Sequence, residues 1–313
     1  MEKEASTPRA RWWLFRKRIL PIALTYAGLV LAPFCFSISG AVVAMLLLVL
    51  TGLGVTVGLH RLLTHRSFST YRWVERTLAT LGALAFQGGV VDWVAIHRLH
   101  HAHCDTEDDP HTPRYSFWRG HFLWLFRYDP RLADQNLKAR YVRDLCKDPY
   151  MEFLEHWSIG LQGLLFLVLY LVGNFVEPDL GLSWAVYGVF VRATALQQMA
   201  WIVNSVSHTW GYRTYATRDQ SVNCWWLTLP SLGEGWHNNH HAYPKSASFG
   251  LRWYELDLGF VAIRLLQALH LAWDVVLADE EVADRAAAQT TMKRERVPDP
   301  SRQQGDPGHL VRR

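Results

Sequence analysis

The chain has 313 residues, of which half are hydrophobic and 19% are charged, with 15 tryptophans and a formal net charge of +4. Its apolar residues form long runs instead of recurring periodically, a distribution typical of membrane proteins. The modest net charge does not favour nucleic acid as a partner, and the basic stretch before the first apolar run suits anionic lipid headgroups instead.

Four apolar runs approach the length of about 20 residues that crosses the hydrocarbon core of a bilayer. They are residues 20–38, 41–59, 157–175 and 183–202. The first three contain no Asp, Glu, Lys or Arg, and the fourth carries only Arg192, which we expect to face the helix bundle or a polar cavity. The first run is too long for a cleavable signal peptide and lacks a small-residue cleavage site, so it is expected to be retained.

The distribution of positive charge predicts the orientation of these spans. The connections between spans one and two and between spans three and four contain no Lys or Arg, whereas basic residues precede span one and occupy 61–156 and the C-terminal region. The positive-inside rule then places both termini in the cytoplasm. We therefore predict an all-α, multi-pass membrane protein with four transmembrane helices in two hairpins and a cytosolic helical cap.

The remaining segments divide the chain further. Residues 1–18 form a basic cytoplasmic segment, 19–278 the membrane domain, and 279–313 a polar tail whose proline, glycine and charge content predicts disorder. Residues 75–94 are mixed in polarity and are expected to lie at the membrane interface, and the apolar stripe of 251–276 is interpreted as scaffold. The four cysteines have no CxxC spacing, so neither a disulfide framework nor an iron–sulfur site is expected.

Nine of the 15 histidines fall into four short clusters on the cytoplasmic side. These are HRLLTH at 60–65, HRLHH at 97–101, NSVSH ending at His208 and HNNHH at 237–241. Imidazole suits iron, zinc, copper and nickel, and nine imidazoles exceed the needs of one tetrahedral zinc site. We therefore expect a polynuclear, di-iron centre. Five of the other six, His103, His121, His156, His270 and His309, are interpreted as surface or core residues.

The spacing within the clusters leads to more detailed expectations. Residues three and four apart share a helix face, so the histidines of each HxxHH motif are predicted to converge on one point. In HRLLTH the gap of five turns His65 about 140° from His60 on an ideal helix, so either the helix ends there or the two histidines serve different metals. Spans two and four run on into His60 and His208, so both helices are expected to protrude into the cytosol.

A metal centre beside a membrane suits oxygen activation on a lipid tail, because acid–base side chains cannot remove hydrogen from an unactivated methylene. Carboxylates close to the clusters in sequence have two interpretations: they orient the imidazoles, or they are solvated surface residues. These carboxylates are Asp105, Glu107, Asp108, Asp109 and Glu234.

The order HRLLTH, HRLHH with DTEDDPH, NSVSHTWGYR and GEGWHNNHHAYP closely resembles the membrane-bound fatty acid desaturases of the delta-9 acyl type. The resemblance covers roughly residues 20–274 and is nearest to the bacterial, cyanobacterial and plant branch. It implies a mushroom-shaped protein with two iron ions that uses O2 and two electrons to insert a cis double bond, often between carbons nine and ten.

The resemblance also implies roles for individual residues. The iron ligands would be His60, His65, His97, His100, His101, His208, His237, His240 and His241, with Asn204 reaching one iron through water. Gln87 and Trp93 match positions near the bend of the acyl tunnel, and Trp201 follows them on span four. Ala200 stands where animal acyl-CoA members typically carry threonine, which leaves the chain length and the position of attack open.

Partners and alternatives follow from the same comparison. No HPGG haem-binding motif of a fused cytochrome b5 is present, so the electrons are expected from a separate ferredoxin or a cytochrome b5 with its reductase. The acyl group could be carried on CoA or on a lipid.

A related di-iron hydroxylase or a desaturase of other regiochemistry is the nearest alternative function. A histidine-rich metal transporter is remote, because it should hold ligands inside the spans, and none of the four contains a histidine.

Overall fold

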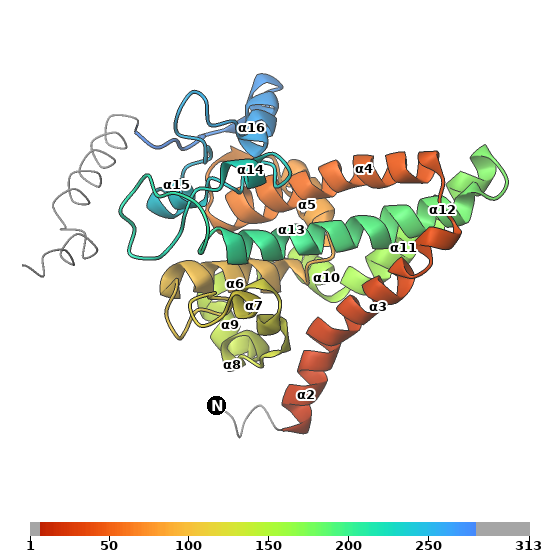
Figure 1. The fold of residues 1–313 in the computed structure, drawn as a ribbon, viewed down its shortest axis with the longest axis horizontal. Helices are drawn as coiled ribbons and strands as arrows, with labels where there is room; N and C mark the ends of the chain where they lie inside the picture. The colour runs from red at the N-terminus through yellow and green to blue at the C-terminus, as the bar shows by residue number, and fades with distance from the viewer. Residues whose placement is uncertain (1–6, 280–313) are drawn as a thin grey trace, which may run out of the picture.

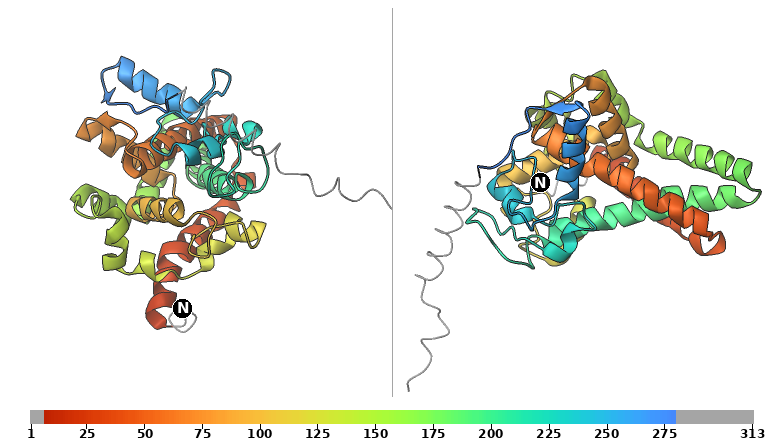
Figure 2. Two further views of the ribbon diagram at one scale, coloured as in Figure 1. Left: turned by 90° about the vertical axis from the view of Figure 1, so that its left-hand side faces the viewer. Right: turned by 90° about the horizontal axis from the view of Figure 1, so that it is seen from above.

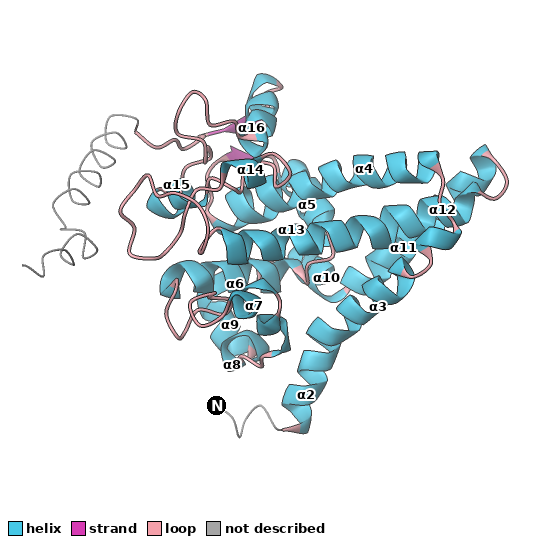
Figure 3. Cartoon of the chain, in the orientation of Figure 1, coloured by secondary structure: helices cyan, strands magenta, loops and turns pink. Residues whose placement is uncertain are grey.

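The structure is a computed structural model of the chain and describes residues 7–279. Long helices extend together toward one end of the molecule, whereas short helices and loops gather at the other end (Figure 1). Figure 2 shows the same division from two further sides. Within the described residues, strand is limited to the short antiparallel pair β1 (Ser69–Thr70) and β2 (Ala272–Trp273) (Figure 3).

The helices follow one another closely along the chain. The first part contains α2 (Pro8–Leu14), η1 (Phe15–Ile19), α3 (Leu20–Leu29), η2 (Ala32–Phe34), α4 (Ile38–Leu53), η3 (Gly54–Thr64), α5 (Arg72–Leu84), α6 (Val90–His103), α7 (Phe117–His121), η4 (Leu123–Phe126), α8 (Pro130–Ala133), α9 (Gln135–Val142) and α10 (Pro149–His156). The second part contains α11 (Ser158–Val176), α12 (Leu180–Val186), η5 (Tyr187–Val191), α13 (Arg192–Val206), α14 (Trp225–Thr228), α15 (His237–Ala242) and α16 (Leu258–Ala268). Of the η elements, η1, η3 and η5 are π-helical and the other two are 3-10 turns.

Three helical segments within residues 7–279 are long and apolar enough to cross a membrane: Pro8–Phe34, Ile38–Thr64 and Ser158–Val176. Their outward side chains, such as Leu46 and Phe175, are apolar and exposed, as lipid contact requires. The fourth predicted span lies in a continuous helix, α12–η5–α13, which is not among these three.

Arg192, the charged residue in that helix, is completely buried. Its guanidinium donates to the carbonyls of Gly188 and Leu84, to the hydroxyl of Thr51 and, at 3.0 Å, to the side-chain oxygen of Gln162. Burial of an arginine is tolerated where its donors are satisfied. As expected, Arg192 faces the bundle, where it joins α4, α11 and the end of α5 to α13.

A second buried polar network holds the start of α6. The ammonium of Lys138 lies 2.8 Å from Asp92, and Lys17 pairs with both Asp92 and Glu155. Glu155 also accepts from the backbone N–H of Asp92 at 3.0 Å, in the first turn of α6. Residues 8–18, expected as a basic segment ahead of the membrane domain, are thus helical and contribute Lys17 to this network. The predicted C-terminal tail lies almost entirely outside the described residues.

Candidate metal centre

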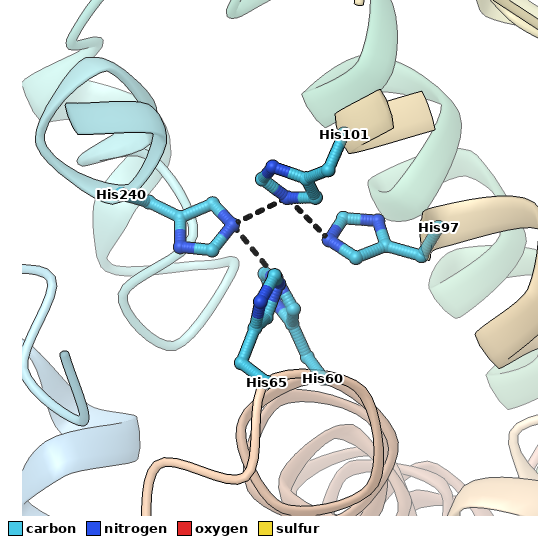
Figure 4. A group of neighbouring side chains, drawn as sticks. All are labelled: His60, His65, His97, His101 and His240. Carbon is cyan, nitrogen blue, oxygen red and sulfur yellow. Dashed lines mark hydrogen bonds between the residues drawn. The ribbon is translucent and has the colours of Figure 1, made fainter. Parts of the chain in front are cut away.

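The structure brings all nine clustered histidines into two adjacent groups, and the ligand atoms of each group lie within 4.8 Å of one another. Group A consists of His60, His65, His97, His101 and His240. Group B consists of His100, His208, His237 and His241. The imidazoles of group A come from η3, α6 and α15 and point toward a common centre (Figure 4).

The five-residue spacing of HRLLTH is explained by the π-helical turn η3. The backbone N–H of His65 donates to the carbonyl of His60 at 3.1 Å, a hydrogen bond that spans five residues. A π-helical turn places residues five apart on one face, which an α-helix does not. The helix ends at Thr64, as one of the two sequence alternatives required, and both histidines belong to group A.

Each HxxHH motif is divided between the two groups, so the expectation that its three histidines converge on one point is wrong. His97 and His101 belong to group A, whereas His100 between them belongs to group B. His237 and His241 belong to group B, whereas His240 belongs to group A. Positions i and i+4 share a helix face, but neighbouring residues are rotated by about 100°. The motif therefore supplies two nitrogen atoms to one position and one to the other.

Carboxylates orient four of the imidazoles through their Nδ1 atoms. In group A, Glu234 lies 2.7 Å from Nδ1 of His60. In group B, Asp109, Asp105 and Asp219 each lie 3.0 Å from Nδ1 of His100, His208 and His241, respectively. A carboxylate on Nδ1 fixes the proton there, so the Nε2 lone pair faces the centre.

Glu234 is itself held by Arg61, whose side chain is completely buried. Arg61 donates to Glu234 at 3.1 Å and to both oxygens of Asp257 at 3.0 Å, and its guanidinium stacks 3.7 Å from the ring centre of Phe249. Asp257 also caps the first turn of α16. The start of α16 is thereby linked through Asp257 and Arg61 to the carboxylate that orients His60.

The site favours neutral imidazole, the form that binds metal. Burial, reinforced by neighbouring positive charge, lowers the pKa well below the ordinary value for His65, His97, His101, His237 and His240. Burial also lowers the pKa of His241 to about 4, against the opposing effect of Asp219. His100 differs: burial disfavours its charge, but the adjacent Asp109 outweighs burial and raises its pKa. Burial opposes the charge of Asp105 as well, yet the hydrogen bond from His208 brings its pKa to about 2.

The donor atoms of both groups fit metal ions. Nε2 of His240 lies 3.1 Å from Nε2 of His60 and 2.9 Å from Nε2 of His101 (Figure 4). In group B, Nε2 of His237 lies 3.1 Å from the Nε2 atoms of His208 and His241. Buried, neutral nitrogen atoms that face one another present several lone pairs to one point, where a cation satisfies them together. Nε2 of His65 has no hydrogen-bond partner within residues 7–279 and is available as a further ligand.

An apolar cavity with about 670 Å³ of empty space reaches both groups. Its wall includes His60 and His97 of group A and His237 of group B. The predicted residues Gln87, Trp93, Ala200 and Asn204 also line it, together with Leu48 and Gly52 on α4. Trp201 lies elsewhere: it lines a smaller neighbouring cavity with Arg18 and Phe86, and Gln87 contributes to the walls of both cavities.

The carboxylates separate into those that touch histidine and those that do not. Asp105, Asp109 and Glu234 take the orienting role, whereas the side chain of Asp108 is 70% exposed and pairs with Arg131. Sequence reasoning missed Asp219, because it lies 22 residues from its partner His241 and next to no histidine motif. It also missed Cys104, whose Sγ lies 3.6 Å from Nε2 of His100. Position after the HxxHH motif was the only available signal for Cys104.

Comparison with known proteins identifies similar chains. Residues 36–273 match the family model described as fatty acid desaturase. The sn-1 stearoyl-lipid 9-desaturase of Anabaena variabilis is 46% identical over 250 residues, which cover 80% of this chain and 88% of that protein. The sn-2 palmitoyl-lipid 9-desaturase of Nostoc sp. (strain 36) is 40% identical, with 88% and 93% covered. Delta-9 acyl-lipid desaturase 1 of Arabidopsis thaliana is 38% identical, with 89% and 90% covered.

Proposed function

Because this chain belongs to the fatty acid desaturase family, we propose that it inserts a cis double bond at carbon nine of a saturated acyl chain carried on a membrane lipid. The protein is an oxidoreductase that desaturates fatty acyl chains. The position of the double bond and the lipid carrier rest on the names of its relatives, which act on stearoyl and palmitoyl lipids at carbon nine.

One observation carries this proposal most strongly: an apolar cavity passes beside both histidine groups. In this cavity, which we call the acyl cavity, a methylene would lie next to His60, His97 and His237 while other parts of the chain contact apolar wall such as Leu48, Val55 and Leu196. A water-poor channel of this kind fixes which carbon is presented, and positioning is the main contribution that the protein makes to an unactivated C–H bond.

We assign two iron ions to groups A and B, with the nine histidines as ligands and Asn204 beside them. The iron would supply the O2-dependent oxidation that removes two hydrogen atoms from the chain. The side chains have other duties: Asp105, Asp109, Asp219 and Glu234 hold protons on Nδ1, and Arg61 neutralises Glu234. Gln87, Trp93 and Ala200 shape the channel. Trp201 supports it from the neighbouring cavity.

The membrane topology is proposed on the same basis. The helix α12–η5–α13 would be the fourth span, shielded by neighbouring helices around Arg192, so that two hairpins carry a cytosolic cap. Both termini and the metal centre would then face the cytoplasm. A separate ferredoxin or cytochrome b5 would donate electrons there.

The test compares fatty acids, with their double-bond positions, in one host expressing the wild-type protein or a His101→Ala variant. New cis-9 monounsaturated chains that disappear in the variant would support the proposal. Hydroxylated chains, or a double bond at another carbon, would contradict it. Purified protein with a defined electron donor repeats the test where the host supplies none.

A further inference from the structure

Arg18 is a buried cation without a counter-ion. Its side chain belongs to a residue that is 5% exposed, and no hydrogen bond or ion pair to its guanidinium exists within residues 7–279. Instead the guanidinium lies 5.6 Å and 5.4 Å from the ring centres of Trp13 and Trp124. A buried arginine retains five N–H donors, which are costly to leave unsatisfied.

Three carboxylates, Asp92, Glu155 and Asp129, act on the charge of Arg18, and each of them pairs with another cation. Asp92 lies 2.8 Å from Lys138 and 3.4 Å from Lys17, and Glu155 pairs with Lys17. Asp129 lies 2.6 Å from Arg131, so none of the three carboxylates forms an ion pair with Arg18. A buried charge of this kind is expected where an anionic ligand completes the pair.

Arg18 lines a cavity that adjoins the acyl cavity at Gln87. This cavity is small, and its wall also includes Lys17, Phe86, Leu125 and Trp201. Gln87 also lines the acyl cavity, so the two spaces meet at this side chain. Arg18 precedes the apolar run that begins at Leu20, which places it at the depth of lipid headgroups. Arg18 also lines a second cavity, whose wall includes Glu107, Asp108, Asp109 and Asp129, so an anion would approach the guanidinium from the side of Phe86 and Gln87.

We propose that Arg18 binds the phosphate of the carrier to which the acyl chain is attached, which makes phosphate-bearing carriers the preferred substrates. This inference rests on the proposed function. Arginine offers paired N–H donors that match two phosphate oxygens, and Trp13 and Trp124 hold the guanidinium plane in place. The headgroup of a phospholipid and the phosphates of CoA share this chemistry. A galactosyl headgroup is neutral and offers Arg18 no charge.

The test measures equilibrium binding in neutral detergent micelles, using the protein as purified and without a reductant. The three probes are oleoyl lysophosphatidylglycerol, oleoyl-CoA and a mono-oleoyl galactosylglycerol. Charged hydrogen bonds are stronger than neutral ones, so we expect at least one phosphate probe to bind roughly tenfold tighter than the galactosyl probe. The tighter of the two phosphate probes identifies the carrier.

Variants assign this preference to Arg18. Arg18→Gln should abolish it, whereas Arg18→Lys should retain part of it. Arg16→Gln is the matched control, because Arg16 is exposed on the same helical segment and carries the same charge. A preference that survives in Arg18→Gln, or that falls equally in Arg16→Gln, would overturn the proposal. If Arg18→Gln weakens the binding of all three probes equally, the proposal is also overturned, because Arg18 would then have a structural role.

A separate measurement keeps this inference distinct from the proposed function. Wild-type protein with iron, an electron donor and O2 is assayed on stearoyl chains of each carrier. Absence of any double bond, with the phosphate preference in binding intact, would overturn the function and support the site. Desaturation of all three carriers with no binding preference would do the reverse.

Discussion

The indole N–H of Trp93 donates to the side-chain oxygen of Gln87 at 3.1 Å, and the amide of Gln87 donates to the carbonyl of Leu196 at 2.9 Å. This bridge connects the start of α6, which carries three of the histidines, to α13 across the wall of the acyl cavity. The path of the acyl chain past groups A and B therefore depends on Gln87.

Replacing Gln87 by leucine should spread the double bond over neighbouring carbons, because Trp93 and α13 lose their connection. A change of about 1.4 kcal/mol in the free-energy difference between two positions of the acyl chain is a tenfold change in the ratio of the two products. Double-bond positions are measured by mass spectrometry of derivatised fatty acids. Gln198→Leu is the control, because Gln198 bonds Tyr26 instead and does not line the acyl cavity. An unchanged product ratio in Gln87→Leu would remove Gln87 from positioning.

Glu234→Gln should weaken metal binding at group A while preserving side-chain shape. The neutral amide no longer fixes the proton on Nδ1 of His60 and leaves Arg61 with one carboxylate partner fewer. Loss of an orienting partner typically costs 10- to 100-fold in metal affinity. Iron per protein, measured by elemental analysis after dialysis against a weak chelator, should fall toward half. Asp108→Asn, which alters an exposed carboxylate, should bind as the wild type does; full iron retention in Glu234→Gln would contradict the assignment.

Chelator-treated protein should lose stability as the pH falls below about 6.5. Burial holds the pKa of several histidines far below 6.5 in the folded state, and that of His241 at about 4. Between the folded and the unfolded pKa of such a histidine, the unfolded chain binds a proton that the folded protein does not. Each of these histidines therefore lowers the free energy of unfolding by up to about 1.4 kcal/mol for each pH unit that the pH falls in this range. Melting temperatures from pH 8 to pH 5 measure this. His156→Gln, at an exposed site, should leave the slope unchanged, and a flat profile in the wild type would refute the expectation.

Gly52→Leu should shift substrate preference toward shorter acyl chains. Gly52 lines the cavity eight residues before His60, or about 12 Å along the helix. A Cβ at this position would already lie 3.0 Å from Leu232 and 3.6 Å from Leu196. A leucine would therefore fill the end of the acyl cavity that lies away from His60. The ratio of 16-carbon to 18-carbon products should rise several-fold. Gly163→Leu, where a Cβ meets nothing within 4 Å, is the control. An unaltered ratio would place the end of the chain elsewhere.

The sequence was most informative for residues that belong to short motifs with characteristic spacing. The nine histidines could be selected from clusters alone, and Gln87, Trp93 and Ala200 were found through a family resemblance. The π-helical turn at His60 and His65 could not be predicted, because the register of hydrogen bonds depends on the packing of η3 against α5. The division of each HxxHH motif follows from helix geometry, but only once two centres are known to flank α6 and α15.

Contacts across long sequence separations were beyond prediction. Asp219 reaches His241 because the loop between α13 and α14 folds back toward α15, and Arg61 meets Asp257 across 196 residues. Arg18 looked like one of several basic residues before the first span, and only its burial distinguishes it from Arg16. Such features arise from tertiary packing, and propensity and periodicity carry no signal for them.

The division of the two HxxHH motifs has a consequence for assembly. α6 and α15 each contribute nitrogen atoms to both groups, so an ion captured by either group would immobilise helices that the other also needs. The first ion would bear the entropic cost of ordering, and the second would bind to ligands already in place. Loading should therefore be positively cooperative, with protein that holds a single ion scarce at intermediate iron concentrations. The same linkage makes loss of one ion a route to losing both.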